Sequence, residues 1–220
     1  MSNEPLTAEP PPDQPDKSLW RRWLLRSRLS LLTEERQRFE KQMADALSAR
    51  AVTEGWQRVL VFLPWKGEPD LVMVWRAWHK RGIALGLPVV EAHDAPLRLV
   101  DWAPGSPMLE DLMGLPAPQS PQSPQSPQSP QAPQAVATAE TASQFDTWVV
   151  PCVGVDQQGS RLGAGKGFYD RTIAARTEQG LPKPRLYGVT FSSCLIPMTL
   201  SEPHDLRLDA VLTERGWRDF

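Results

Sequence analysis

Short runs of aliphatic and β-branched residues alternate along this chain with segments of helical periodicity, and no other feature limits its fold as strongly. The apolar runs predict strands at residues 58–65, 87–92, 97–102, 147–156, 185–191 and 209–213. The helical spacing falls at residues 17–50, 70–81 and 169–179. Strands that alternate with helices build a sheet of mostly parallel strands, because each helix carries the chain back across one face. We therefore expect an α/β fold, a three-layer sandwich with a mostly parallel central sheet.

The first helical segment concentrates positive charge. Residues 17–28 hold five basic side chains and no acidic one. Lys17 and Arg21 lie four residues apart and so share one face of a helix. A second helix is predicted to start at Thr33, because its hydroxyl can cap free amides and the acidic residues after it suit the positive end of a helix. We therefore expect two helices here, with a break near Leu32–Thr33.

Proline is concentrated outside the predicted elements. The chain has 23 prolines, and residues 119–133 read QSPQSPQSPQSPQAP. A proline at every third position blocks the hydrogen bonding of helices and sheets and favours an extended polyproline conformation. We predict a disordered insertion at about 117–144 and a disordered tail at 1–16, so that residues 17–220 form one domain that the insertion interrupts. The alternative is that the repeat is a ligand for a proline-recognising partner.

Charge and hydropathy argue against several classes of protein. The net charge of −2 and an isoelectric point near 6.0 argue against a nucleic-acid partner, which needs a basic excess. No apolar run approaches the roughly 18 residues of a membrane span, and the acidic N-terminal segment does not resemble a secretory signal. The two cysteines, Cys152 and Cys194, lie far apart in apolar surroundings. That placement argues against a disulfide scaffold or a zinc site and leads us to expect a cytoplasmic protein.

A glycine-rich turn is the strongest chemical signal in the sequence. Residues 159–171 read GSRLGAGKGFYDR and stand between an apolar run and a helical segment. Gly163, Gly165 and Gly167 would let backbone amides approach an anion, and the helix start that follows adds positive potential. The spacing matches neither of the two common nucleotide-binding patterns. The pattern alone therefore leaves open a flexible glycine loop with solvated basic side chains.

Charged side chains of the same turn extend this chemistry. Arg161 and Lys166 would supply full positive charges to the anion. Asp170 stands where a carboxylate could hold a magnesium ion against phosphates. In sheets of this kind a ligand binds beyond the carboxyl ends of the strands, which is where the turn begins. The turn therefore predicts a phosphate-binding site.

The segment RLGAGKGFYDR, preceded by VPCVGVDQQGS, closely resembles the signature of the 5-formyltetrahydrofolate cyclo-ligase family. Other segments resemble family features in the same order: KSLWRRWLLRSR the basic N-terminal helix, FLPWKGEPDL the segment around a substrate-binding glutamate, LRLVDWAPGSPMLEDLMGLPAP the stretch before the main motif, and PHDLRLDAVLTERG the C-terminal motif. The resemblance covers roughly residues 17–118 and 145–216. The chain departs from the family at Cys152, where glycine is usual, at Leu71, where a small residue such as threonine is frequent, and in the proline-repeat insertion.

The resemblance implies a fold and an activity. The fold is Rossmann-like and related to the scaffold of ribose-phosphate isomerases and CoA-transferases. The activity is the ATP- and Mg²⁺-dependent conversion of 5-formyltetrahydrofolate to 5,10-methenyltetrahydrofolate, by phosphorylation of the formyl oxygen and ring closure by N10. ATP and the folate are then the expected partners, and we expect a monomer.

The resemblance also implies roles for individual residues. The expected ATP-binding residues are Lys17, Arg21, Arg161, Leu162, Gly163, Ala164, Gly165, Lys166, Gly167, Phe168 and Tyr169. The expected folate-binding residues are Glu68, Ala164, Gly165, Lys166, Gly167 and Phe168. Lys166 and Arg161 are the expected catalytic residues. Asp170 and Asp205 are the expected magnesium ligands, with Asp209 as the alternative second ligand.

Two further functions fit the same residues. A sugar-phosphate isomerase or acyltransferase on a related scaffold would use the anion-binding loop without requiring ATP. A non-catalytic binding protein could keep the pocket and use the proline-rich arm for partners. Formation of a methenyl product with and without Mg-ATP would separate the three hypotheses.

Overall fold

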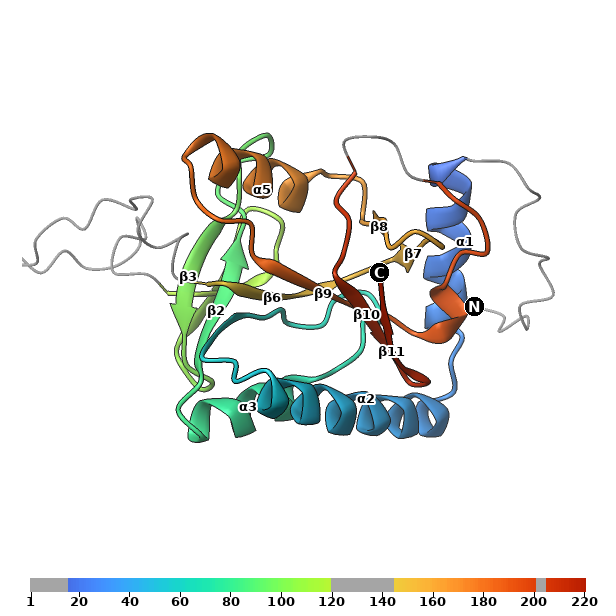
Figure 1. Cartoon of the computed structure of the whole chain (residues 1–220), viewed down its shortest axis with the longest axis horizontal. Helices are drawn as coiled ribbons and strands as arrows, with labels where there is room; N and C mark the ends of the chain where they lie inside the picture. The colour runs from blue at the N-terminus through green and yellow to red at the C-terminus, as the bar shows by residue number, and fades with distance from the viewer. Residues whose placement is uncertain (1–15, 120–144, 201–204) are drawn as a thin grey trace, which may run out of the picture.

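The computed structural model describes residues 16–119, 145–200 and 205–220, and its centre is a seven-stranded sheet (Figure 1). In spatial order the strands are β11 (Gly216–Asp219), β10 (Ala210–Thr213), β9 (Arg185–Val189), β6 (Thr147–Pro151), β1 (Arg58–Leu60), β2 (Ala84–Val89) and β3 (Arg98–Trp102). The strands from β10 to β2 are parallel to their neighbours, whereas the edge strands β11 and β3 are antiparallel. The prediction of a mostly parallel central sheet is confirmed.

Helices cover both faces of this sheet. The helices α2 (Thr33–Thr53) and α3 (Val72–Lys80) lie on one face, and α5 (Phe168–Glu178) lies on the other (Figure 1). Side chains alternate across each strand, so Val59 and Val61 pack with Trp75 of α3, whereas Leu60 packs with Trp148 in the layer that α5 covers. The predicted three-layer sandwich is therefore confirmed.

Helix α1 (Lys17–Leu29) stands beyond one end of the sheet (Figure 1). Its Trp20 and Leu24 pack against Val153, Leu162 and the short helical turn η1 (Ser192–Cys194). The carboxylate of Asp16 caps the helix by accepting hydrogen bonds from the amides of its first turn at 2.7 and 3.2 Å. In the part of the chain that the structure describes, no helix is both long enough and apolar enough to cross a membrane.

Several element boundaries differ from the predicted ones. The first strand ends at Leu60 rather than at residue 65, although the Val61 amide still donates to the Gly86 carbonyl of β2 at 2.8 Å. The second strand runs over Ala84–Val89 rather than 87–92: its end is set at Val90, whose amide donates to the Asp111 side chain at 3.1 Å instead of to a strand. The second helix has Leu32, not Thr33, at its cap, and no side chain caps it. The predicted break between α1 and α2 is confirmed.

Two small hairpin ladders lie outside the main sheet. Strands β7 (Gly154–Val155) and β8 (Arg161–Leu162) pair with each other, as do β4 (Met108–Glu110) and β5 (Pro116–Pro118). The predicted insertion at 117–144 therefore begins too early, because Ala117 and Pro118 are buried in β5. Residues 120–144 of that prediction and residues 1–15 of the tail predicted at 1–16 lie outside the described residues, whereas Asp16 is ordered as the cap of α1.

A carboxylate at the far end of α2 ties that helix to the sheet. Glu54 accepts hydrogen bonds from the Tyr187 hydroxyl, from the Trp56 indole at 3.1 Å and from the Arg50 guanidinium at 2.6 Å. Burial alone would raise the pKa of Glu54, but these bonds outweigh it and lower the pKa from 4.5 to about 2. The ionised carboxylate therefore stabilises the fold above its ordinary pKa of 4.5, and that stabilisation is lost as the pH falls towards 2.

We expect Glu54→Gln to lower the free energy of unfolding by about 2 kcal/mol at pH 7 and by much less at pH 3, because the wild-type group has begun to lose its advantage there. Urea unfolding at the two pH values measures the difference. Asp45→Asn, at an exposed position in the middle of the same helix, is the matched control and should change neither value. An equal loss at both pH values would show that the ionisation of Glu54 is irrelevant to stability.

Candidate active site

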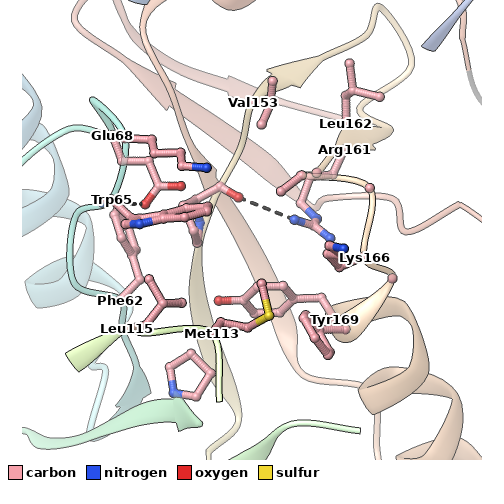
Figure 2. Close-up of a pocket in the computed structure, with 18 of the residues that line it drawn as sticks. Phe62, Trp65, Glu68, Met113, Leu115, Val153, Arg161, Leu162, Lys166 and Tyr169 are labelled. Carbon is pink, nitrogen blue, oxygen red and sulfur yellow. Dashed lines mark hydrogen bonds between the residues drawn. The ribbon is translucent and has the colours of Figure 1, made fainter. Parts of the chain in front are cut away.

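A single cavity of about 660 Å³ lies beyond the carboxyl ends of β1, β2 and β6. Its floor and walls are largely apolar and include Phe62 and Trp65 after β1, Val90 after β2, and Met113 and Leu115 from the hairpin of β4 and β5 (Figure 2). Helix α1 and the segment that joins β8 to α5 close its other side. This is the position in which parallel α/β sheets bind their ligands.

The glycine-rich turn forms the polar wall of the cavity. It connects β8 to the first turn of α5, and its residues 164–166 are exposed. Gly165 and Gly167 have φ angles of +86° and +67°, a region in which a side chain would strain the backbone. Within the described parts of the chain, the amides of residues 163–167 donate to no acceptor. Free amides at the start of a helix are suited to an anion such as a phosphate.

Basic side chains surround this turn. The guanidinium of Arg21 donates to the carbonyl of Gly163 at 3.0 Å and so fixes α1 against the turn. Arg161 lies over the Tyr169 ring at 4.8 Å, and its side chain is only 7% exposed. Its Nη1 donates to the Pro151 carbonyl at 3.4 Å, and its buried Nε has no partner among the described residues. Lys166 lies on the same side of the cavity (Figure 2).

Two aspartates complete the polar wall. The carboxylate of Asp170, in the first turn of α5, lies 3.6 Å from the Arg161 guanidinium, and that of Asp205 lies 2.7 Å from the Lys17 ammonium. Both residues line the main cavity and also a second hollow of about 350 Å³ beside it. Asp209 does not line either hollow: its carboxylate accepts the Leu186 amide at 2.7 Å, near the amino end of β9.

Asp170 and Asp205 fit a magnesium ion. Magnesium prefers hard oxygen ligands and is commonly held by one or two carboxylates together with phosphates of a substrate. The described residues contain no cluster of three metal-ligating side chains, so an all-protein cage for a metal is absent from that part of the chain. Asp170 and Asp205 line the same two hollows, so both carboxylates could contact a magnesium ion bound to a phosphate there.

Glu68 faces the basic wall from across the cavity (Figure 2). Its carboxylate accepts the Trp65 amide at 3.0 Å and lies 3.9 Å from the Arg28 guanidinium. Burial raises the pKa of Glu68 from 4.5 to about 7, against the opposing effects of Arg28, the Trp65 amide and Arg161. Near neutral pH this group is therefore divided between its protonated and its ionised form.

The raised pKa of Glu68 predicts how the free energy of unfolding depends on pH. A carboxyl whose pKa is higher in the folded state contributes stability that is fully present below about pH 4.5 and is lost as the pH rises through about 7. Glu68→Gln removes the titration, so the free energy of unfolding of this variant, relative to the wild type, should rise by about 2 kcal/mol between pH 5 and pH 8. Urea unfolding at both pH values tests it, and a constant difference would contradict the raised pKa.

The cavity brings together all of the predicted site residues. Each of the residues expected to bind ATP, the folate or magnesium lines it: Lys17, Arg21, Glu68, Arg161, Leu162, Gly163, Ala164, Gly165, Lys166, Gly167, Phe168, Tyr169, Asp170 and Asp205. Sequence reasoning did not single out Arg28, nor the apolar wall formed by Met113 and Leu115. Arg28 belongs to the basic segment 17–28, but nothing in the sequence distinguishes it from its exposed neighbours.

The two substitutions relative to the family pattern lie outside the polar part of the cavity. Cys152 is buried beside Gly188, where an added Cβ would approach its sulfur within 3.0 Å. Burial also raises the pKa of the Cys152 thiol to about 12, so it stays protonated and is not a nucleophile. Leu71 is buried in the core beneath α3. Both residues are therefore part of the packing.

The fold and the cavity together define an α/β protein in which a basic glycine loop faces a largely buried carboxyl group across an apolar pocket. The model of the 5-formyltetrahydrofolate cyclo-ligase family matches residues 13–214. The chain therefore belongs to the 5-formyltetrahydrofolate cyclo-ligase family.

Individual relatives are similar over different lengths. A 5-formyltetrahydrofolate cyclo-ligase from Mycolicibacterium smegmatis is 40% identical over 79 residues, which are 35% of this chain and 38% of that protein. The protein of that name from Escherichia coli K12 is 27% identical over 196 residues, 86% of this chain and 96% of its own. The alignments with the relatives from M. smegmatis and Mus musculus thus span little more than a third of the length of each relative.

Solved structures share the fold. The NMR structure of 5,10-methenyltetrahydrofolate synthetase from Aquifex aeolicus superposes with a TM-score of 0.70 at 25% identity and covers 92% of both chains. The 5,10-methenyltetrahydrofolate synthetase from Mycoplasma pneumoniae superposes with a TM-score of 0.63 at 20% identity, over 90% of this chain and 99% of that one. The prediction that the chain has the fold of this family is confirmed.

Proposed function

We propose that this protein converts 5-formyltetrahydrofolate to 5,10-methenyltetrahydrofolate in a reaction that consumes ATP and requires magnesium. One observation carries the proposal: a single cavity joins a basic glycine loop at a helix start to a buried carboxyl group in apolar surroundings. The loop suits the phosphates of ATP, and the apolar pocket around Glu68 suits the pterin ring. Membership of the family and the names of the relatives support the same assignment.

The chemistry needs alignment and charge neutralisation more than acid–base catalysis. The formyl oxygen attacks the γ-phosphorus of ATP, the bond to the bridging oxygen breaks, and ADP leaves with the electron pair. N10 then attacks the activated formyl carbon, its proton is lost to solvent, and phosphate leaves with the former formyl oxygen. The product is the 5,10-methenyl cation. Holding two ligands in line and stabilising transferred negative charge are the main contributions of a protein to such a step.

The residues of the polar wall have distinct roles in this proposal. Lys166 and Arg161 stabilise negative charge on the γ-phosphoryl group as it transfers, and the amides of the glycine loop hold the phosphate chain. Lys17 and Arg21 bind ATP from α1. Asp170 and Asp205 hold magnesium, which when bound offsets the charge of the phosphates. Asp209 is left out because its carboxylate is engaged at the opposite end of β9.

Glu68 recognises the folate. Its ionised carboxylate can accept hydrogen bonds from the amino group and ring N–H along one edge of the pterin. The pterin would lie against the apolar wall that includes Trp65 and Leu115. Residues of the loop from Ala164 to Phe168 line the same cavity, and we propose that they contact the folate where it meets the γ-phosphate.

The compartment and the oligomeric state of the protein are also part of the proposal. The two cysteines of the chain, Cys152 and Cys194, are free and buried, which agrees with a reducing compartment such as the cytoplasm. We propose that the protein acts there as a monomer, with ATP and the folate as its ligands. Gel filtration with light scattering would test the monomer.

The decisive experiment is formation of the methenyl product, followed by its ultraviolet absorbance. The purified protein is incubated with 5-formyltetrahydrofolate and either Mg-ATP, ATP with a chelator, or magnesium without ATP. We expect product only in the first reaction, with one ADP released for each methenyl group. Product without ATP would contradict the proposed mechanism, and absence of product at saturating Mg-ATP and folate would contradict the proposed function.

A further inference from the structure

Arg28 is a buried cation near the end of α1 that lines the cavity. It is 2% exposed, whereas Arg22 and Arg26 of the same helix are exposed. The Nε atom donates to the Lys66 carbonyl at 2.9 Å, and Nη2 donates to the Trp65 carbonyl at 3.4 Å. A guanidinium is rarely buried so completely unless it has a partner charge or a fixed set of acceptors.

These two acceptors belong to the turn that carries Glu68. The turn is held on its other side by Arg36 of α2, whose Nη1 donates to the Gly67 carbonyl at 2.9 Å. Arginines on both sides of the break between α1 and α2 therefore bind three successive carbonyls of the turn. The turn itself is unusual, because Lys66 has a φ angle of +46°, a conformation that costs energy for a residue with a side chain.

The carboxylate of Glu68 also lies close to Arg28. The distance of 3.9 Å between Arg28 Nη2 and Glu68 Oε1 is an ion-pair contact, too long for a hydrogen bond. The carboxylate is thus attracted to Arg28 while both of its oxygens keep acceptor capacity. At this separation in a buried site an opposite charge favours the ionised carboxylate by a large factor.

We propose that Arg28 is a positioning residue that fixes the Trp65–Glu68 turn and keeps the Glu68 carboxylate ionised for recognition of the folate. This inference rests on the proposed function, because it assigns Glu68 to the pterin. Arg28 does not contact the reacting atoms: it acts through Glu68 and through the backbone of the turn. The expected consequence is on folate binding and its pH dependence, and much less on the chemical step.

Other charged and titratable groups near Glu68 also affect its ionisation. Arg161 of β8 acts on the carboxyl in the same direction as Arg28 but more weakly. The Cys152 thiol after β6 and the Tyr169 hydroxyl of α5 belong to the same buried cluster, and burial raises the pKa of each, so both stay neutral near pH 7. Arg28 is therefore the main charge that favours ionisation of Glu68.

The test measures KM for 5-formyltetrahydrofolate and kcat from pH 5.5 to 9 in the wild type, Arg28→Met and Arg28→Lys. In the wild type, KM should begin to rise as the pH falls below about 7, where Glu68 becomes protonated. In Arg28→Met the pH below which KM begins to rise should be about 1 to 3 units higher than in the wild type. KM at pH 7 should therefore increase about fivefold or more. Arg28→Lys should restore part of the shift, and kcat at saturating folate should change by less than about threefold.

Two control variants separate positioning from general packing. Arg36→Met removes the other arginine from the turn without removing the ion pair with Glu68, so it should leave the pH at which KM rises unchanged. Arg26→Met replaces an exposed arginine of the same helix and should change nothing. A KM for Arg28→Met that increases equally at all pH values, or a loss confined to kcat, would overturn the proposal.

The ionisation of Glu68 can also be measured without substrate, which tests the role of Arg28 independently of the proposed function. The carboxyl of Glu68 can be titrated directly by infrared difference spectroscopy, with Glu68→Gln to identify its signal. Its titration should occur at a higher pH in Arg28→Lys, and higher still in Arg28→Met if that variant is folded. A wild type that makes no methenyl product would remove the proposed function, whereas an unchanged titration of Glu68 in Arg28→Lys and Arg28→Met would remove this inference alone.

Discussion

Asp170→Asn should lower kcat by a factor of about 10² or more and leave the melting temperature close to that of the wild type. The carboxylate stands in the first turn of α5, lines the cavity and is 35% exposed, so the fold gains little from its charge. Asparagine keeps the shape but cannot supply the negative oxygen that a magnesium ion prefers. It also removes the ion pair with Arg161, which would leave that guanidinium less precisely placed against the phosphates.

The measurement is turnover as a function of magnesium concentration. The variant should need a higher magnesium concentration to reach its half-maximal rate, and its rate at saturating magnesium should stay below that of the wild type. Asp45→Asn, at an exposed position of α2, is the matched control for loss of one carboxylate charge. Near-normal turnover in a folded Asp170→Asn variant, with an unchanged response to magnesium, would remove Asp170 from the proposed metal site.

The architecture could be predicted from the sequence because local pattern and global fold agree. The runs around Val59 and Val149 are apolar on both faces, as strands covered by helices on both sides must be. The edge of the sheet was harder to predict. Strand β11 has the sequence GWRD and only Trp217 of it packs against the core, so its apolar signal is too weak to identify a strand. An edge strand tolerates such polarity because one side of it meets solvent.

The site could be predicted where its chemistry lies in one continuous segment. The loop from Arg161 to Asp170 carries glycines, charges and a helix start within ten positions, so the sequence itself predicts a phosphate site there. Arg28 shows the opposite case. Its burial depends on carbonyls of a turn that is 37 and 38 residues away, and no local pattern encodes that contact. Choosing between Asp205 and Asp209 likewise required the structure, because Asp205 lines the cavity whereas the Asp209 carboxylate accepts the Leu186 amide.

Lys166→Met should lower kcat by a factor of about 10² to 10³, which corresponds to about 3 to 4 kcal/mol of transition-state stabilisation. Lys166 stands between Gly165 and Gly167 in the exposed part of the loop and lines the cavity on the same side as Arg161 (Figure 2). Its ammonium would gain interaction energy as negative charge moves onto the transferring phosphoryl oxygens. Methionine has similar length and removes only that charge.

Affinity for the folate should fall much less than kcat, because the contacts proposed for the pterin come from Glu68 and the apolar wall across the cavity. Calorimetric titration with 5-formyltetrahydrofolate and single-turnover kinetics with Mg-ATP separate the two effects, and Lys41→Met on α2 controls for loss of one exposed ammonium group. If Lys166→Met binds the folate much more weakly but its single-turnover rate at saturating folate is unchanged, Lys166 contacts the folate and not the γ-phosphate. The stabilisation of the transferred charge would then have to come from Arg161 and the amides of the loop.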